Sequence, residues 1–255
     1  MALPGALLDA IRFLTVVRVP DTATAMAPDW LARAMKYFPV VGAGVGLVSA
    51  LVMLIANEFW SPVISALLAV TASIVVTSAL HEDGLADTAD AFGGGWSVEK
   101  RLAIMKDSRI GTYGALALGL GVLLRVTAIS DLPMWAAPAA LIAAQAAARA
   151  APAWVMNRMA YAGDTAAMKV AYAEAPVRSN ELRFALLIVA LAALPLALIS
   201  FKAVVIGWLG GAALAWCLAR WSRRLIGGYT GDVLGAVEQL FEIGFLLGVA
   251  AVIQG

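Results

Sequence analysis

The chain has 255 residues, of which 62% are hydrophobic and 14% are charged, whereas soluble domains are about half apolar and about a quarter charged. This apolar excess excludes a disordered protein, the single cysteine excludes a disulfide scaffold, and the net charge of +1 argues against a nucleic-acid binder. The composition therefore predicts an all-α fold, a polytopic integral membrane helix bundle forming a single membrane-embedded domain over residues 1–255.

The predicted elements begin with an N-terminal helix. Residues 1–20 have apolar side chains at helical spacing, contain Asp9, and lack a small-residue cleavage site after an apolar core. They predict a helix that lies in the membrane interface, or one that packs on the bundle, and both interpretations stay open. About seven stretches then have the roughly 20 apolar residues that a spanning helix needs. They lie at about 38–57, 62–80, 112–130, 136–156, 184–200, 203–219 and 233–253.

Basic residues are distributed unevenly between the segments that connect these spans. Fifteen lysines and arginines fall on one side, Lys202 falls on the other, and Arg125 and Arg149 lie within spans. The basic side of a membrane protein faces the cytoplasm. We therefore expect a multi-pass protein with its N-terminus inside and a functional site that faces the cytoplasm, where the long connections lie.

A run of ionisable residues follows the second predicted span directly, at residues 81–90. If this run is helical, Asp83, Asp87 and Asp90 fall at i, i+4 and i+7, within an arc of about 60° on one face. Carboxylates stacked in this way repel one another, and grouped hard oxygen ligands suit magnesium, manganese or calcium. Two such ions would stabilise both the entering and the leaving oxygen of a phosphoryl displacement. The alternative is a solvated acidic segment at the end of a helix.

Two neighbours of these aspartates are also candidate catalytic residues. His81, the only histidine of the chain, is a candidate general base or metal ligand, or else a hydrogen-bonded residue at the end of the span. Glu82 is a candidate proton acceptor, as is Asp90 if it holds no metal.

Further polar residues precede the third and the seventh span. Lys106 and Arg109 are spaced to hold phosphate oxygens, or they are only a basic flank, and Asp107 is a candidate fourth metal ligand. Asp232 follows three glycines at the foot of the last span, which again places a carboxylate beside flexible backbone.

Carboxylates and arginines also occur inside the spans, where they are costly and therefore functional candidates. Glu238 and Glu242 lie in the last span. Arg125 and Arg149 are their natural ion-pair partners, or additional phosphate contacts.

These segments closely resemble signature stretches of the cobalamin (5′-phosphate) synthase family, the adenosylcobinamide-GDP ribazoletransferases. The resemblance covers nearly the whole chain in order, and its aspartate block and Thr-Gly-Asp block are specific. It departs from the family pattern at Val16, Ala148 and Gln239, where the family usually has an arginine, a serine and an acid. The matching stretches are residues 13–15, 19–20, 38–42, 81–90, 106–114 and 227–236.

The resemblance implies a magnesium-dependent enzyme of the bacterial inner membrane, with residues 1–255 as one catalytic domain; manganese is the alternative metal. Adenosylcobinamide-GDP and α-ribazole, or its 5′-phosphate, would give adenosylcobalamin, or its 5′-phosphate, and GMP. Membrane lipid and either a second copy of the chain or other cobalamin-assembly enzymes are the expected partners, and no nucleic acid is expected. The implied metal ligands are Asp83, Asp87 and Asp90, with Asp107 and Asp232 next. The implied substrate-phosphate contacts are Lys106, Arg109, Arg149 and Thr230.

Two other functions remain open at this point. A CDP-alcohol phosphatidyltransferase also uses helical aspartates, but its signature would place alanine and arginine where this chain has Asp87 and Thr88. A cation-coupled transporter would place its acidic residues near the middle of the bilayer, often within internal repeats, and no repeat is visible here.

Overall fold

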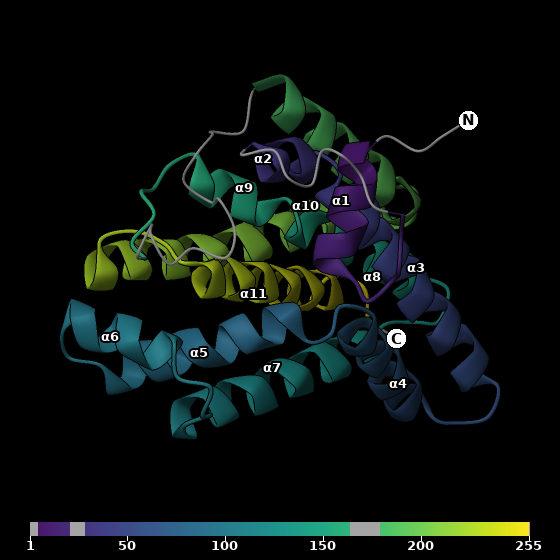
Figure 1. The fold of residues 1–255 in the computed structure, drawn as a ribbon. Helices are drawn as coiled ribbons and strands as arrows, with labels where there is room; N and C mark the ends of the chain where they lie inside the picture. Colours follow the sequence, from purple (N-terminus) through teal and green to yellow (C-terminus); the bar gives the residue numbers. More distant parts are fainter. Residues whose placement is uncertain (1–4, 21–28, 164–178, 255) are drawn as a thin grey trace.

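The computed structural model describes residues 5–20, 29–163 and 179–254, and Figure 1 shows how they are arranged. These residues are helical apart from short connections and an isolated bridge between Tyr161 and Tyr229, which confirms the predicted all-α class. The helices are α1 (Gly5–Leu14), α2 (Trp30–Met35), α3 (Phe38–Asn57), α4 (Pro62–Val76), α5 (Leu80–Gly94), α6 (Val98–Met105), α7 (Thr112–Ser130), α8 (Ala137–Ala148), α9 (Ala151–Met156), α10 (Ser179–Ile226) and α11 (Gly231–Ala250).

Several of these helices have the length and composition of membrane spans. Within the described part, α3, α7, α8 continued into α9, α10 and α11 are long and apolar enough to cross a membrane, and α4 with α5 makes a sixth if the bent pair is one span. Non-helical backbone at Ser200 divides the 48 residues of α10 near the boundary between the predicted spans 184–200 and 203–219. A membrane protein is thereby supported, whereas seven spans and their orientation stay predictions.

Proline places the start of four helices, because its fixed φ and missing N–H suit the first helical turn. The prolines in the first turns of α3, α4, α8 and α9 are Pro39, Pro62, Pro138 and Pro152. Small residues then let the helices approach closely, as at Gly42 and Gly46 of α3, which lie against the backbone of α8.

The second predicted span, 62–80, is corrected by the structure: α4 ends at Val76 and α5 continues at an angle of 91°. Ser78 and Ala79 form the break with φ values of 53° and 55°, a left-handed conformation that costs roughly 1–3 kcal/mol per non-glycine residue. The N–H of Val16 donates to the carbonyl oxygen of Val76 at 2.9 Å and so satisfies one acceptor at the end of α4. The acidic segment is therefore a separate helix rather than an extension of the span.

The N-terminal helices pack on this bend and on α3. Ala10 and Leu14 of α1 join Leu31 and Met35 of α2 and Phe38 of α3 in one buried apolar cluster. Of the two interpretations of the N-terminal helix, these contacts support packing on the bundle, and insertion into the membrane interface stays a prediction.

Two glycines bring α5 and α11 into backbone contact. Figure 1 shows α5 lying between α7 and α11. A Cβ atom on Gly84 would lie 2.6 Å from the carbonyl oxygen of Asp232, and one on Gly235 would lie 3.4 Å from the Cα of Gly84. The first turn of α11 is therefore held directly against the acidic helix.

We predict that Gly84→Ala separates α5 from α11 and lowers stability. Overpacking of a tight contact costs about 1–3 kcal/mol, because the obstructing atom is backbone and cannot rotate away. The matched control is Gly119→Ala in α7, since a Cβ there meets nothing within 4 Å. Thermal unfolding of the purified variants in detergent should show a lower melting temperature for Gly84→Ala only. Equal melting temperatures would contradict the role of this contact.

Candidate active site

Three of the predicted aspartates lie near one another where α5 packs on α11. Asp83 is exposed and Asp87 is half-buried on α5, and Asp232 is half-buried in the first turn of α11. The charged groups that repel the carboxylate of Asp87 most strongly are the carboxylates of Asp83, Asp232 and Asp90. Asp83 likewise repels Asp232. The structure therefore gathers negative charge from two helices at one place, through the contact at Gly84.

Asp90 belongs to the same helix face but has partners of its own. Its carboxylate accepts hydrogen bonds from the N–H of Gly111 at 2.6 Å and from the N–H of Gly114 at 2.9 Å. A Cβ atom on either glycine would collide with this carboxylate. Asp90 thus holds the positive end of the α7 dipole against α5, and metal binding or proton transfer by Asp90 stays a prediction.

Asp107 pairs with a cation on the loop before α7. It accepts hydrogen bonds from Nη2 and Nε of Arg109 at 2.6 Å and 3.0 Å and from the Arg109 backbone N–H at 3.1 Å, which lowers the pKa of Asp107 to about 2. Asp90, Asp107 and Arg109 line an open hollow beside α6 and α7, and the neighbouring Lys106 is exposed. Asp83 and Asp232 line a different cavity, so the structure does not gather all five predicted metal ligands.

Thr230 is the N-cap of α11. Its hydroxyl oxygen accepts a hydrogen bond from the N–H of Val233 at 3.3 Å, and the residue is buried. This cap starts α11 directly before Asp232 and so helps to place that carboxylate. A phosphate contact of Thr230 stays a prediction.

A cavity of about 140 Å³ lies beside Asp83 and Asp232. One wall carries ionisable groups and the other carries apolar side chains from the N-terminal helices. The residues of the ionisable wall are His81, Asp83, Arg149, Asp232 and Glu238, and the apolar wall includes Phe13, Leu14, Leu31, Met35 and Phe38.

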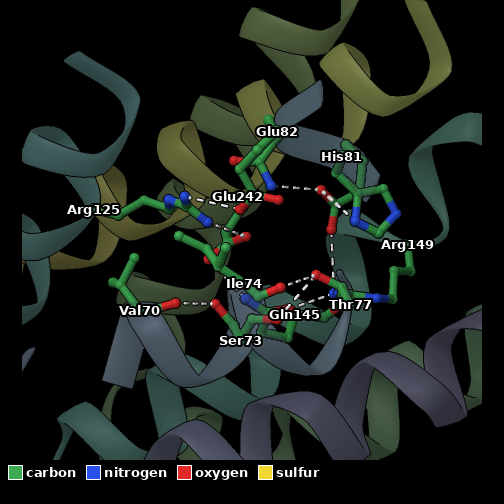
Figure 2. Close-up of polar contacts among 12 residues, drawn as sticks. Val70, Ser73, Ile74, Thr77, His81, Glu82, Arg125, Gln145, Arg149 and Glu242 are labelled. Atoms are coloured by element: carbon green, nitrogen blue, oxygen red, sulfur yellow. Dashed lines mark hydrogen bonds and ion pairs between the residues drawn. The ribbon is translucent and has the colours of Figure 1, made fainter. Parts of the chain in front are cut away.

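A network of buried polar side chains packs against the residues of the ionisable wall (Figure 2). Nη2 of Arg125 donates to Oε1 of Glu82 at 3.0 Å, and Nη1 of Arg125 lies 3.6 Å from Oε2 of Glu242. Nε2 of Gln145 donates to Oε1 of Glu242 at 2.8 Å. Glu82, which the sequence offers as a proton acceptor, is thus paired with an arginine inside the bundle.

The network continues from Gln145 to the cavity. Nη1 of Arg149 donates to the backbone oxygen of Gln145 at 3.1 Å and also contacts its side-chain oxygen. The same nitrogen lies 3.1 Å from Oε1 of Glu238, whose Oε2 lies 3.7 Å from Nδ1 of His81. The ion pairs expected for Arg125 and Arg149 are therefore present, and they join α5, α7, α8 and α11.

Sequence reasoning missed Gln145 of the buried network and two residues of the apolar wall. Gln145 is the one polar side chain of the alanine-rich α8, and a lone amide in an apolar span is a signal that marks it as a candidate. Leu31 and Met35 carry no comparable signal, because they are ordinary packing residues in the sequence.

The donor set of this site fits a hard divalent cation. The carboxylates of Asp83, Asp87 and Asp232 are oxygen ligands of the kind that magnesium and manganese prefer, and their mutual repulsion leaves negative charge to be neutralised. Among the described residues, no three His, Cys, Asp or Glu side chains lie close enough together to enclose a metal ion. Metal binding is therefore an expectation from the chemistry of the ligands.

We predict that Arg125→Leu strongly destabilises the bundle. The change leaves Glu82 and Glu242 without their cation in the interior, and breaking a buried ion pair costs roughly 3–5 kcal/mol. Arg109→Leu is the matched control, because the side chain of Arg109 is 86% exposed. Thermal unfolding in detergent should show a large loss for Arg125→Leu and little change for the control. Similar losses of thermal stability in both variants would show that the network does not stabilise the bundle.

Known proteins match this chain over almost its full length. An adenosylcobinamide-GDP ribazoletransferase of Azorhizobium caulinodans is 44% identical over 251 residues, which cover 94% of this chain and 93% of the relative. Proteins of the same name from Shewanella piezotolerans and Leptothrix cholodnii are each 40% identical. The alignments cover 92% of this chain and 91% of the Shewanella protein, and 94% of this chain and 92% of the Leptothrix protein.

No solved structure matches the chain at a significant level. The family model described as cobalamin-5-phosphate synthase matches residues 6–250, which include every residue of the candidate site. The chain therefore belongs to the cobalamin-5-phosphate synthase family.

Proposed function

We propose that the protein transfers the adenosylcobinamide phosphate of adenosylcobinamide-GDP to α-ribazole or its 5′-phosphate, by metal-assisted phosphoryl transfer. One observation carries the proposal: Asp83, Asp87 and Asp232 converge from α5 and α11 beside a cavity, in a chain of this family. Adenosylcobalamin, or its 5′-phosphate, and GMP would be the products.

In the proposed reaction, the 3′-hydroxyl oxygen of α-ribazole attacks the phosphorus that carries the cobinamide. A new phosphorus–oxygen bond forms, the bond to the bridging oxygen of GMP breaks, and GMP leaves with that electron pair. The hydroxyl proton passes to the ionisable wall of the cavity. His81 is our candidate acceptor, since Glu82 and Asp90 hold other partners.

We propose that Asp83, Asp87 and Asp232 hold Mg²⁺, or Mn²⁺. A divalent cation held by these residues would supply positive charge that offsets the negative charge developing on the leaving GMP. The three carboxylates position that charge, and the contact between Gly84 and α11 fixes their distance from one another. Asp90 and Asp107 are weaker candidates because both already accept hydrogen bonds.

Cations near the site are candidates for holding substrate phosphates. Lys106 and Arg109 are exposed on the loop before α7, and Arg149 lines the cavity. We place this site on the cytoplasmic side of the bacterial inner membrane, with the N-terminus inside, because the basic residues collect on that side of the predicted spans.

The test compares GMP release by Asp83→Asn, Asp87→Asn and Asp131→Asn variants. Removing a negative oxygen from the metal site should lower kcat by roughly 100-fold for the first two, with protein that still inserts and folds. Asp131 follows the C-terminal end of α7, whereas Asp90 contacts the N-terminal end of that helix. The Asp131→Asn variant is therefore the matched control and should retain turnover.

The assay follows GMP from adenosylcobinamide-GDP and α-ribazole over a series of magnesium concentrations. Near-normal turnover of either Asp83→Asn or Asp87→Asn at saturating magnesium would show the metal-site assignment to be wrong. Transfer to CDP-activated lipid in place of α-ribazole would instead indicate a phosphatidyltransferase.

A further inference from the structure

The cavity beside Asp83 and Asp232 has an apolar interior that the proposed phosphoryl transfer does not use. Leu14, Leu31, Met35 and Phe38 line it and are only 2%, 2%, 3% and 5% exposed. Phe13 completes this wall and stacks on Phe38 with ring centroids 5.8 Å apart. A deep apolar wall opposite a carboxylate site indicates a ligand with one apolar end and one reactive polar end.

The volume of the cavity limits that apolar end to a small group. An apolar cavity of roughly 150 Å³ accommodates one benzene ring, so the 140 Å³ present here suits one six-membered aromatic ring, with any further ring of the same base nearer the mouth. A complete nucleoside or a corrin ring is too large for this space.

We propose that this cavity binds the aromatic base of α-ribazole and leaves the ribose at the carboxylate mouth. The inference rests on the proposed function and names the subsite of its acceptor substrate. The base of α-ribazole is a dimethylbenzimidazole, whose outer ring and methyl groups are hydrocarbon. Such a ring gains from burial against Phe13, Leu31 and Phe38.

The polar wall is complementary to the rest of the nucleoside. The base has one ring nitrogen that accepts a hydrogen bond, and Arg149, which lines the cavity, carries a buried Nε–H with no hydrogen-bond partner among the described residues. Asp83 is exposed and Asp232 is half-buried, so the cavity is open to solvent on this side. A base bound in the interior therefore presents the ribose hydroxyls where the carboxylates gather.

Guanine of the second substrate fits the same wall poorly. Its ring edges carry several hydrogen-bond donors and acceptors, and each one buried against leucine, methionine or phenylalanine would lose its partner. The apolar wall thus favours the benzimidazole over the guanine as its occupant.

The test fills the cavity from its apolar wall with Leu31→Phe. We expect KM for α-ribazole to rise about tenfold or more, while KM for adenosylcobinamide-GDP changes by less than roughly twofold, because a pocket discriminates strongly against a group that no longer fits. An α-ribazole analogue with unsubstituted benzimidazole, which lacks the two methyl groups, should recover most of the lost affinity. Rescue by the smaller base would not follow from general damage to the fold.

Leu132→Phe is the matched control. Leu132 is also buried, at 4% exposure, and it borders a separate hollow at the C-terminal end of α7. This variant should have the wild-type KM for α-ribazole and for adenosylcobinamide-GDP. Met35→Phe, at a second position of the apolar wall, should reproduce the pattern of Leu31→Phe if the latter variant folds poorly.

Equilibrium dialysis of α-ribazole against the purified protein, without adenosylcobinamide-GDP, separates this inference from the proposed reaction. Wild-type binding that is lost in Leu31→Phe and kept in Leu132→Phe supports the subsite even if no GMP is released. Wild-type turnover with an unchanged KM for α-ribazole in both Leu31→Phe and Met35→Phe would overturn the subsite and leave the proposed function intact. An effect confined to adenosylcobinamide-GDP would assign the cavity to that substrate and would equally overturn the proposal.

Discussion

The close contact of α5 with the first turn of α11 is the constraint on which the site depends. Gly84 leaves no room for a side chain and Gly235 packs directly against it, and this close approach brings Asp232 near Asp83 and Asp87. The same contact brings like charges together, since the carboxylates of Asp83 and Asp232 both repel that of Asp87, and such an arrangement costs free energy by itself. Grouping these oxygen ligands therefore lowers the stability of the fold locally, which is typical of functional sites.

The buried network offsets part of the strain of assembling such a site inside an apolar bundle. Arg125 and Arg149 each contact glutamates from α5 or α11, and Gln145 connects the two arginine centres. Unpaired charge is very costly away from water, so these pairings require the four helices to keep one relative position. Hydrogen bonds and ion pairs here act less as a source of net stability than as a means of fixing geometry.

The sequence predicts the helical class, the membrane character and the face shared by Asp83 and Asp87, because these follow from composition and from the helical period. It places Asp90 on that face but cannot reveal that α7 docks its N-terminus there, since this contact joins distant segments. The break between α4 and α5 is equally hidden, because Ser78 and Ala79 are not residues that favour a left-handed backbone. The cavity depends on packing between helices that lie far apart in the sequence, so only the tertiary structure discloses it.

The hydrogen bond from Val16 to Val76 also bears on how the molecule is assembled. It links the residues after α1 to the end of a helix made later during synthesis, so this bond can form only once α4 has been made. The cavity itself can close only after α11 has been made, because Asp232 and Glu238 of α11 belong to its ionisable wall. The order of synthesis therefore makes this cavity one of the last parts of the protein to close, because its lining comes from both the first and the last helix of the chain.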